Sequence, residues 1–488
     1  MGFSCFEINN NLHTNIVGVL IRVDRSVRSW ISHPRHKHPP LDLLYIQSGL
    51  QTMNCNVQLI DMWIHRKPLY QIARQIILSK RLFAVIKAYS WCIQESIALG
   101  TILRKNNVIT IAVGQHVNHA DVVSNDNESF KNDWSMAFDY SIIGDPESEC
   151  PQLIEQLLLR NDNSQLDRYR HFQQKHQQPD KNLPYPQFSS KMMNDYAFPF
   201  PVSQLNHKKW VYIQTSWGCP HRCLHCSNAV RKSYGKLLFK RDSSDVVNEI
   251  KFHIKKGAQA ICFEDDALFT DKTHIRLLLQ HMQQQNIVIP WMAHARPDEL
   301  NEPILESASK SGLKLLKIGV ESGAEKQIEI IGKAANGAQW IAQVKRVFQL
   351  LNKYNIASIA MFMIGTPDET EEDIYQSISL AKELAPDYIQ VQCFTPYPDT
   401  IFYQTLPPKS REMINTMQCY HYSNNHWSAA KISEKQILRY QYIFYRSFYG
   451  RAEYIINFFK NNKAFLNRRS ILIDYIKSLV NMKRWRNI

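Results

Sequence analysis

The chain has 488 residues, of which 44% are hydrophobic and ten are cysteines. This length predicts more than one globular domain, and cysteines this sparse exclude a small disulfide-stabilised fold. The net charge of +14 suits anionic partners but identifies none, because charge balance governs solubility and nonspecific attraction rather than fold.

Neither a membrane span nor a targeting segment is predicted. The opening residues, MGFSCFEINN, combine no basic region with an apolar one. The longest apolar runs, such as 357–365, fall short of the roughly 20 residues that a transmembrane helix needs. We therefore expect a cytoplasmic protein without a transmembrane segment.

The first predicted domain covers residues 1–158 and alternates short apolar runs with helical patterns. Runs of this kind, bounded by turn residues, indicate buried strands. Strands that alternate with helices predict an open parallel α/β sheet. The predicted strands lie at 15–23, 57–61, 82–90, 108–113 and 140–144, with helical patterns at 43–53 and 69–80 between them.

A polar linker at 159–205 separates this domain from a second strand–helix alternation at 206–404. The linker is rich in Gln, Asn, His and charge, and its prolines favour extended backbone. Six consecutive strand–helix units predict a partial parallel (β/α)6 barrel with its chemistry at the carboxyl ends of the strands. The predicted strands are 210–216, 258–265, 287–295, 313–320, 357–365 and 388–394.

The last region, 405–488, is predicted to be helical and basic, since it mixes aromatic, aliphatic and basic residues at helical spacing. Helices packed on the barrel with a solvated basic face are the simplest interpretation. Contact with a membrane surface or with nucleic acid stays open as an alternative for this region.

Cys219, Cys223 and Cys226 form a C-x3-C-x2-C cluster directly after the first predicted strand of the barrel. Three thiolates can hold three irons of a 4Fe–4S cluster, which prefers cysteine ligands. The fourth iron then stays open to a ligand that carries an amine and a carboxylate. A zinc site completed by His221 or His225 is the alternative, but zinc is usually held by two spaced pairs of ligands and no second pair follows.

This loop resembles the signature of the radical S-adenosylmethionine (SAM) superfamily. The resemblance implies that the cluster binds SAM and cleaves it reductively to a 5′-deoxyadenosyl radical, which abstracts a substrate hydrogen. It also implies that the cofactor carries the difficult chemistry while the protein positions and shields it. Cys219, Cys223 and Cys226 become the expected catalytic and metal-binding residues, and His225 takes the place of an aromatic ring near adenine.

Further segments resemble the family in the expected order over about 190 residues. FEDDALFTD (263–271) resembles its acidic stretch, GVESG (319–323) its SAM-binding element, and MFMIGTPDE (361–369) its G-x-P segment. A charge-assisted hydrogen bond to the SAM ammonium is expected from the acidic stretch. The resemblance implies that these residues bind SAM: Asp265, Asp266, Arg296, Glu321, Ser322, Gly323, Gly365 and Pro367.

The first domain resembles the flavodoxin-like cobalamin-binding domains that precede some radical SAM barrels. PPLDLLYIQSGL (39–50), VGQHVNHADV (113–122) and FDYSIIGDPESE (138–149) carry this resemblance. The motif D-x-H-x-x-G is absent, and Asp42 and Gln115 stand where the family has glycine. Cobalamin is therefore a candidate further cofactor, with a domain kept for scaffolding or partner contacts as the alternative.

These patterns predict a radical SAM enzyme, with cobalamin-dependent methyl transfer to carbon as the candidate reaction. Oxidation or cyclisation with a vestigial cobalamin domain, RNA methylthiolation, and a degenerate carrier or interaction protein remain alternatives. The expected partners are a small-molecule or natural-product substrate and an electron donor such as flavodoxin or ferredoxin; nucleic acid is not expected. The substrate itself cannot be read from the residues.

Overall fold

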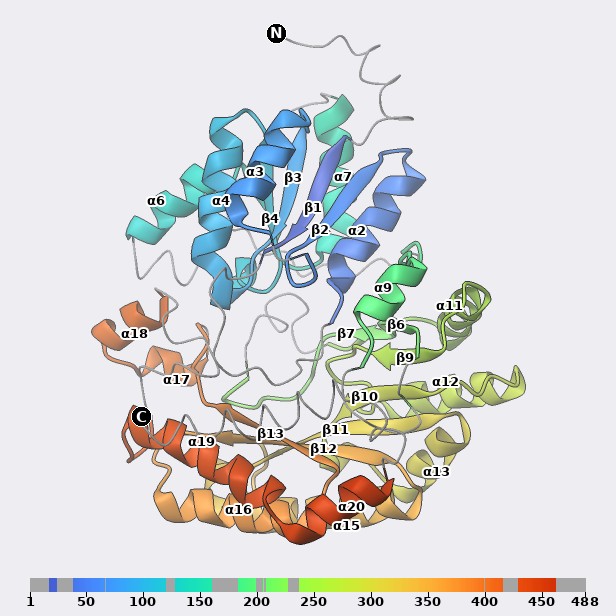
Figure 1. Cartoon of the computed structure of the whole chain (residues 1–488), viewed down its shortest axis with the longest axis vertical. Coiled ribbons are helices and arrows are strands. Elements are labelled where there is room, and N and C mark those ends of the chain that lie inside the picture. The colour runs from blue at the N-terminus through green and yellow to red at the C-terminus, as the bar shows by residue number, and fades with distance from the viewer. Residues whose placement is uncertain are drawn as a thin grey trace.

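The computed structural model describes residues 17–23, 38–65, 67–119, 128–159, 183–198, 205, 208–226, 237–398, 400–415 and 429–461. Two parallel sheets, each flanked by helices, make up this part of the chain (Figure 1). The expected α/β architecture with a helical C-terminal region is confirmed.

The N-terminal sheet has five parallel strands in the order β2-β1-β3-β4-β5, the flavodoxin-like order. All five match the apolar runs at which strands were predicted. The strands are β1 Gly18–Arg22, β2 Val57–Asp61, β3 Phe83–Lys87, β4 Ile109–Val113 and β5 Tyr140–Ser141. The accompanying helices are α2 Leu41–Thr52, α3 Leu69–Leu78, α4 Ile93–Lys105, α6 Glu128–Ala137 and α7 Pro146–Leu159, with short 3₁₀ turns at Ser90–Cys92 and Val117–His119.

The second sheet has six parallel strands in the order β13-β12-β11-β10-β9-β6, an open partial barrel. Its strands are β6 Trp210–Ile213, β9 Ala260–Phe263, β10 Trp291–Ala295, β11 Leu313–Glu321, β12 Ala357–Ile364 and β13 Tyr388–Cys393. All six predicted strands are present; β10 begins four residues later than predicted, immediately after Pro290, which has no N–H to donate to a neighbouring strand. The short antiparallel pair β7 Ser216–Trp217 and β8 Phe239–Lys240 was not predicted.

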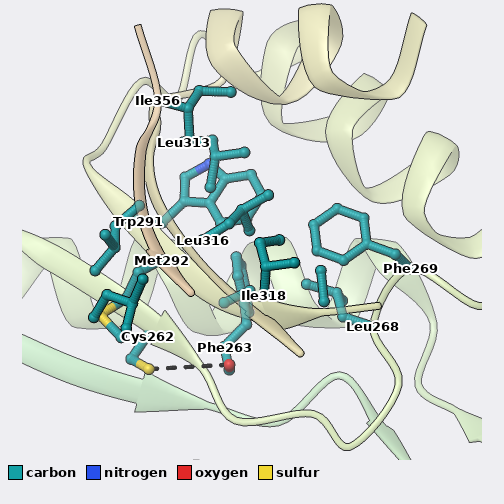
Figure 2. Packing of buried hydrophobic residues seen from close by; sticks show 14 of the residues in the cluster. Cys262, Phe263, Leu268, Phe269, Trp291, Met292, Leu313, Leu316, Ile318 and Ile356 are labelled. Carbon is teal, nitrogen blue, oxygen red and sulfur yellow. Dashed lines mark hydrogen bonds between the residues drawn. The ribbon is translucent and has the colours of Figure 1, made fainter. Parts of the chain in front are cut away.

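Helices cover the outer face of this sheet, and the N-terminal unit lies over its inner face (Figure 1). In Figure 2, Leu268, Phe269 and Ile318 gather in the packing of buried side chains, while Cys262 and Met292 lie together apart from them. These outer helices are α11 Ser243–Lys255, α12 Lys272–Gln284, α13 Glu302–Lys310, α14 Glu325–Ile330, α15 Gly337–Lys353, α16 Glu371–Leu384, α19 Glu434–Tyr449 and α20 Ala452–Asn461. Helices α17 Ile401–Gln404 and α18 Pro408–Asn415 instead pack on the N-terminal unit, whose core includes Tyr403 and Ile414. The short helix α9 Ser190–Asp195 lies in the expected linker.

The carboxyl ends of the two sheets face each other. The fully buried guanidinium of Arg22, at the end of β1, donates to the carbonyl of His38. His38 Nδ1 in turn lies 2.8 Å from Glu264 Oε1, just beyond β9 of the barrel. Polar contacts therefore run from the edge of the N-terminal sheet to the inner face of the barrel.

A second bridge between the units passes through the segment that holds α9. The hydroxyl of Tyr196 donates to Asp61 at the end of β2. The hydroxyl of Tyr212 on β6 donates to the Tyr196 carbonyl at 2.6 Å. Since Tyr196 and Tyr212 are almost fully buried, these bonds lie within packed protein, where electrostatic interactions are stronger than in water.

Helix α19 packs along β13, the edge strand of the barrel. The hydroxyl of Tyr449 accepts a hydrogen bond from Ile389 N at 3.0 Å and lies 3.2 Å from Ile389 O. Tyr445 makes the same pair of contacts to Val391, at 2.9 and 3.3 Å. Two tyrosine hydroxyls thus occupy backbone groups that a seventh strand would otherwise pair.

We expect Tyr449→Phe to lower the free energy of unfolding by about 1–3 kcal/mol. The substitution keeps the ring but leaves the amide and carbonyl of Ile389 without this partner, and an unsatisfied buried polar group costs about that much. Urea unfolding followed by circular dichroism measures the loss. Tyr70→Phe is the control, since Tyr70 is 64% exposed on α3 and its substitution should leave the midpoint unchanged; equal midpoints for all three proteins would contradict the expectation.

None of the helices in the described part of the chain is long and apolar enough to cross a membrane. The prediction of a helical C-terminal region is confirmed by α18, α19 and α20, and residues 462–488 of that region lie outside the described residues. The domain boundaries proposed from the sequence stay a prediction.

Candidate functional site

Cys219, Cys223 and Cys226 lie in the loop that follows β7, at the carboxyl end of the barrel. Desolvation raises the pKa of the Cys226 thiol to about 12, and the nearby Cys223 and Cys219 add to the rise. The three sulfurs are therefore close enough to influence one another. Among the described residues, no three His, Cys, Asp or Glu side chains are placed to hold a single metal ion; a 4Fe–4S cube instead places each thiolate on its own iron.

The cysteine loop is anchored to the turn after α14. Leu224 N donates to Ile331 O at 2.9 Å, and His225 Nδ1 lies 3.2 Å from the same carbonyl. Gly332 has a left-handed backbone conformation (φ +64°), which favours glycine, and a Cβ there would lie 2.6 Å from Leu224 Cγ. His225 is thus held in a partly buried position within the loop, where desolvation lowers the pKa of its imidazole.

Arg296, just beyond β10, joins the cysteine loop to the turn after α14. Its Nη1 donates to Cys223 Sγ at 3.1 Å, and its Nη2 donates to Lys333 O at 3.0 Å and to Asp298 at 2.8 Å. A cation beside a thiol favours the thiolate, which is the form that binds metal.

Glu299 holds the same loop from another direction. Its Oε1 lies 2.6 Å from His221 Nε2 and accepts a hydrogen bond from Thr270. His221 and Thr270, with the other groups around the carboxylate, keep the pKa of Glu299 below its ordinary value although burial opposes this. The sequence prediction missed Glu299, because nothing in residue spacing links it to a loop 78 positions earlier.

We expect Glu299→Ala to loosen the cysteine loop and to reduce the iron retained after anaerobic reconstitution and desalting. Loss of a hydrogen bond to a charged partner costs about 1.5–3 kcal/mol. Glu302→Ala is the control: Glu302 lies on the exposed surface of α13, paired with Lys353. Iron content equal to that of the parent protein in Glu299→Ala would argue against a role of Glu299 in holding the loop.

Glu321 ends β11 with φ +71°, a left-handed conformation that a glutamate adopts at a cost. Its Oε1 accepts a hydrogen bond from Lys333 Nζ at 2.8 Å. A Cβ on Gly319 would lie 2.7 Å from that carboxylate oxygen and 3.1 Å from Lys333 Nζ. Glycine at 319 therefore makes room for the Glu321–Lys333 pair.

Lys333 is a candidate functional residue that the sequence prediction missed. It is 9% exposed, its ammonium lies 5.4 Å from the ring centre of Trp340, and the Arg296 guanidinium lies 5.1 Å from the same ring. Burial raises the pKa of Glu321, but Lys333, His225 and Arg296 more than offset this, and the net shift is downward. The sequence carried no signal for this pair, because Glu321 and Lys333 lie 12 positions apart and follow no periodic pattern.

Asp265 and Asp266, the two acidic residues after β9, lie in different environments. Asp265 is buried and accepts hydrogen bonds from Thr215 N, Thr215 Oγ1 and Ser216 Oγ at 2.6–3.2 Å. Asp266 is exposed, with no hydrogen bond to another described residue.

Ser322 and Gly323 fasten the end of β11 to α16. Gly323 N donates to Ser377 Oγ at 2.8 Å, and Ser322 Oγ lies 3.2 Å from the same hydroxyl. A Cβ on Gly323 would lie 2.5 Å from Gln376 O. This glycine therefore permits close approach to a helix of the chain itself, whereas close approach to a ligand was expected.

Gly365 and Pro367 follow β12 at the same edge of the barrel. Gly365 has φ +82°, and a Cβ there would lie 2.8 Å from Ile437 Cδ1, so the turn requires glycine. Its amide donates to Glu369, whose pKa burial raises to about 8.

The corresponding edge of the N-terminal sheet is closed by its own side chains. Lys87 Nζ pairs with Asp42 at 2.7 Å, and a Cβ on Gly114 would lie 3.1 Å from Lys87 Cγ. His116 is fully buried, with Nδ1 3.0 Å from Ser90 Oγ. Glycine at 114 thus serves packing within the chain, and Lys87 and His116 both bond to neighbouring side chains of the chain itself.

Comparison with known proteins gives the context for this geometry. The sequence family described as the radical SAM superfamily matches residues 213–381. An uncharacterised methyltransferase from Pyrococcus horikoshii is 28% identical over 300 residues, which are 59% of this chain and 60% of the relative. The match therefore spans less than two thirds of that relative's length.

Two solved structures share the fold over both units. The radical SAM methyltransferase TsrM from Kitasatospora setae superimposes with a TM-score of 0.60 at 13% identity, covering 80% of this chain and 76% of TsrM. The cobalamin-dependent radical SAM enzyme OxsB gives a TM-score of 0.56 at 15% identity, covering 88% of this chain and 60% of OxsB. At these identities the likeness shows the fold alone.

Proposed function

We propose that this chain, whose residues 213–381 form a radical SAM domain, is an enzyme that reductively cleaves SAM at a 4Fe–4S cluster. The observation that carries the proposal is the contact between the cysteine loop and Arg296, which donates to Cys223 Sγ at 3.1 Å and lies near the Glu321–Lys333 pair. A cluster requires thiol ligands, and a zwitterionic ligand such as SAM requires a cation and a carboxylate nearby.

Cys219, Cys223 and Cys226 would hold the cluster, and their loop is fixed by Ile331 and Glu299. When bound, the cluster would supply the electron that splits the sulfonium bond of SAM. The Arg296 guanidinium stabilises negative charge on Cys223, because a charge-assisted contact is stronger in partly buried surroundings.

The remaining residues would bind SAM through polar contacts. Asp266 would accept hydrogen bonds from the SAM ammonium, since the carboxylate of Asp265 already accepts hydrogen bonds from Thr215 and Ser216. Glu321, oriented by Lys333, would accept hydrogen bonds from ribose hydroxyls or from the methionine part.

Adenine would lie between the two loops that the family resemblance assigns to it. His225 takes one side, held by the Ile331 carbonyl, and the turn at Gly365 and Pro367 takes the other. Ser322 and Gly323 would act by holding β11 against α16. A small organic substrate and an electron-donating flavodoxin or ferredoxin complete the proposal.

The experiment is anaerobic reconstitution of the full chain with iron and sulfide, followed by dithionite and SAM. We expect about four irons per chain and formation of 5′-deoxyadenosine, quantified by mass spectrometry. A protein that binds a stoichiometric cluster but never cleaves SAM, or that binds no cluster, would contradict the proposed function.

Cobalamin-dependent methyl transfer is a second candidate function. The carboxyl edges of the two sheets face each other across the His38–Glu264 contact, which would place a group bound on one sheet near chemistry on the other. Corrinoid measured by absorbance after reconstitution and desalting tests this candidate, and its absence at saturating hydroxocobalamin would remove it.

A further inference from the structure

The inner face of the barrel is accessible to solvent. Residues on the outer face of the same strands, such as Leu316 and Ile318, are fully buried. Alternate residues on the inner face are instead partly exposed: Glu264, His294, Met361, Met363, Gln390 and Gln392. Because side chains alternate between the two faces of a strand, this pattern shows that solvent reaches part of the inner face, called the hollow here, although Cys262, Met292 and Leu315 on the same face are fully buried.

Charged and hydrogen-bonding groups gather at one side of this hollow on adjacent strands. His294 on β10 and Lys317 on β11 are direct partners in the parallel register, so their side chains leave the sheet side by side. Met292 is the partner of Cys262, which places Glu264 next to His294. His38 of the N-terminal unit reaches the same cluster, and the side chains of His38 and Glu264 are 33% and 24% exposed.

Lys317 lies on the inner face of the barrel, on the interior strand β11, although it is only 5% exposed. Burial lowers its pKa, and Cys262 and Glu264 oppose that shift. An apolar side chain would stabilise a barrel strand at least as well, because removing an ammonium from water is costly. Strongly perturbed groups that line a hollow are characteristic of functional sites.

His294 is neutral at physiological pH. Burial lowers its pKa to about 3, and the neighbouring Lys317 contributes. It can therefore donate one hydrogen bond without adding charge. Glu264 is contacted by His38 Nδ1 at 2.8 Å and by Cys262 Sγ at 3.0 Å, and its charge also acts on Lys317.

We propose that Lys317, as the cation, and His294, as a neutral donor, bind the carboxylate of a small organic substrate beside the His38–Glu264 pair. This inference rests on the proposed radical SAM function and names the substrate class for that site. Lys317 lies four residues before Glu321 on β11, which is about 13 Å along a strand. The acid group is thereby anchored away from the reacting carbon, and both units of the chain line the substrate site.

The test uses the reconstituted full chain with SAM and a panel of aliphatic and aromatic monocarboxylic acids, each matched with its primary amide. Binding is measured by saturation-transfer NMR and by isothermal titration. We expect acids to bind and the matched amides to bind at least about tenfold more weakly, because a buried cation discriminates charge. No preference for any acid over its amide would overturn the proposal, and this comparison needs no variant.

Lys317→Met then locates the site, with Lys314→Met, at the start of the same strand, as the control. We expect Lys317→Met to weaken acid binding at least about tenfold and Lys314→Met to leave it unchanged. Acid binding that is unaffected in Lys317→Met would overturn the assignment of Lys317. Uncoupled SAM cleavage is measured in the parent protein alongside: cleavage without any preference for acids means that the substrate site fails, whereas no cleavage means that the proposed function fails.

Discussion

Cys223→Ser is expected to bind far fewer than about four irons per chain after anaerobic reconstitution and to form no 5′-deoxyadenosine. A serine hydroxyl is not a thiolate, so one corner of the cluster loses its ligand. The Arg296 guanidinium, which donates to Cys223 Sγ, would then face an uncharged group. Iron and sulfide assays, electron paramagnetic resonance after reduction, and mass spectrometry of the nucleoside product measure the effect.

Cys55→Ala is the matched control for this change. Cys55 is 2% exposed in the N-terminal unit, next to β2 and far along the chain from the cluster loop. It should retain iron and SAM cleavage at parental levels. A stable cluster with full SAM cleavage in Cys223→Ser would show that the loop is not the cluster site.

Asp61→Ala is expected to lower the free energy of unfolding by about 3–5 kcal/mol, because it leaves a buried guanidinium without its counterion. Arg22 is fully buried, and its Nε donates to Asp61 Oδ1 at 2.8 Å while Nη2 contacts Oδ2. Trp63 lies under the guanidinium at 4.2 Å. The Tyr196 hydroxyl also loses its acceptor, so the bridge between the units weakens together with the N-terminal sheet.

Chemical unfolding monitored by tryptophan fluorescence measures this loss. Glu306→Ala, which breaks the exposed Lys310–Glu306 pair, is the control and should change little, since exposed ion pairs contribute little. The double variant Arg22→Met/Asp61→Leu should recover much of the loss, because apolar replacement of a buried pair is often neutral. A loss in Asp61→Ala no greater than in the control would contradict the account.

The strands of both sheets were predictable because parallel strands buried on both faces are continuous apolar runs. The N-terminal strands 15–23 and 108–113 are examples, and the structure has them as Gly18–Arg22 and Ile109–Val113. The cysteine loop was predictable for a different reason, since its ligands are close in sequence.

The parts of the site that escaped prediction join distant segments through polar side chains. Lys333 reaches back to Glu321, and Glu299 reaches the loop of His221. The spacing of such pairs follows neither the helical nor the strand period. In the sequence alone their polar side chains cannot be told from those of ordinary surface residues. Gly323 shows the converse, since a glycine within a ligand motif is required by α16 of the chain itself.

The tyrosine hydroxyls of α19 on β13 have a consequence for self-association. An uncovered edge strand offers its amides and carbonyls to any extended segment, which is a common route to strand addition and aggregation. Tyr445 and Tyr449 occupy those groups at Val391 and Ile389, so the barrel can stay open at six strands without an unpaired edge at β13. Removal of α19 would expose that edge, and this helix thus protects the barrel against strand addition by other chains.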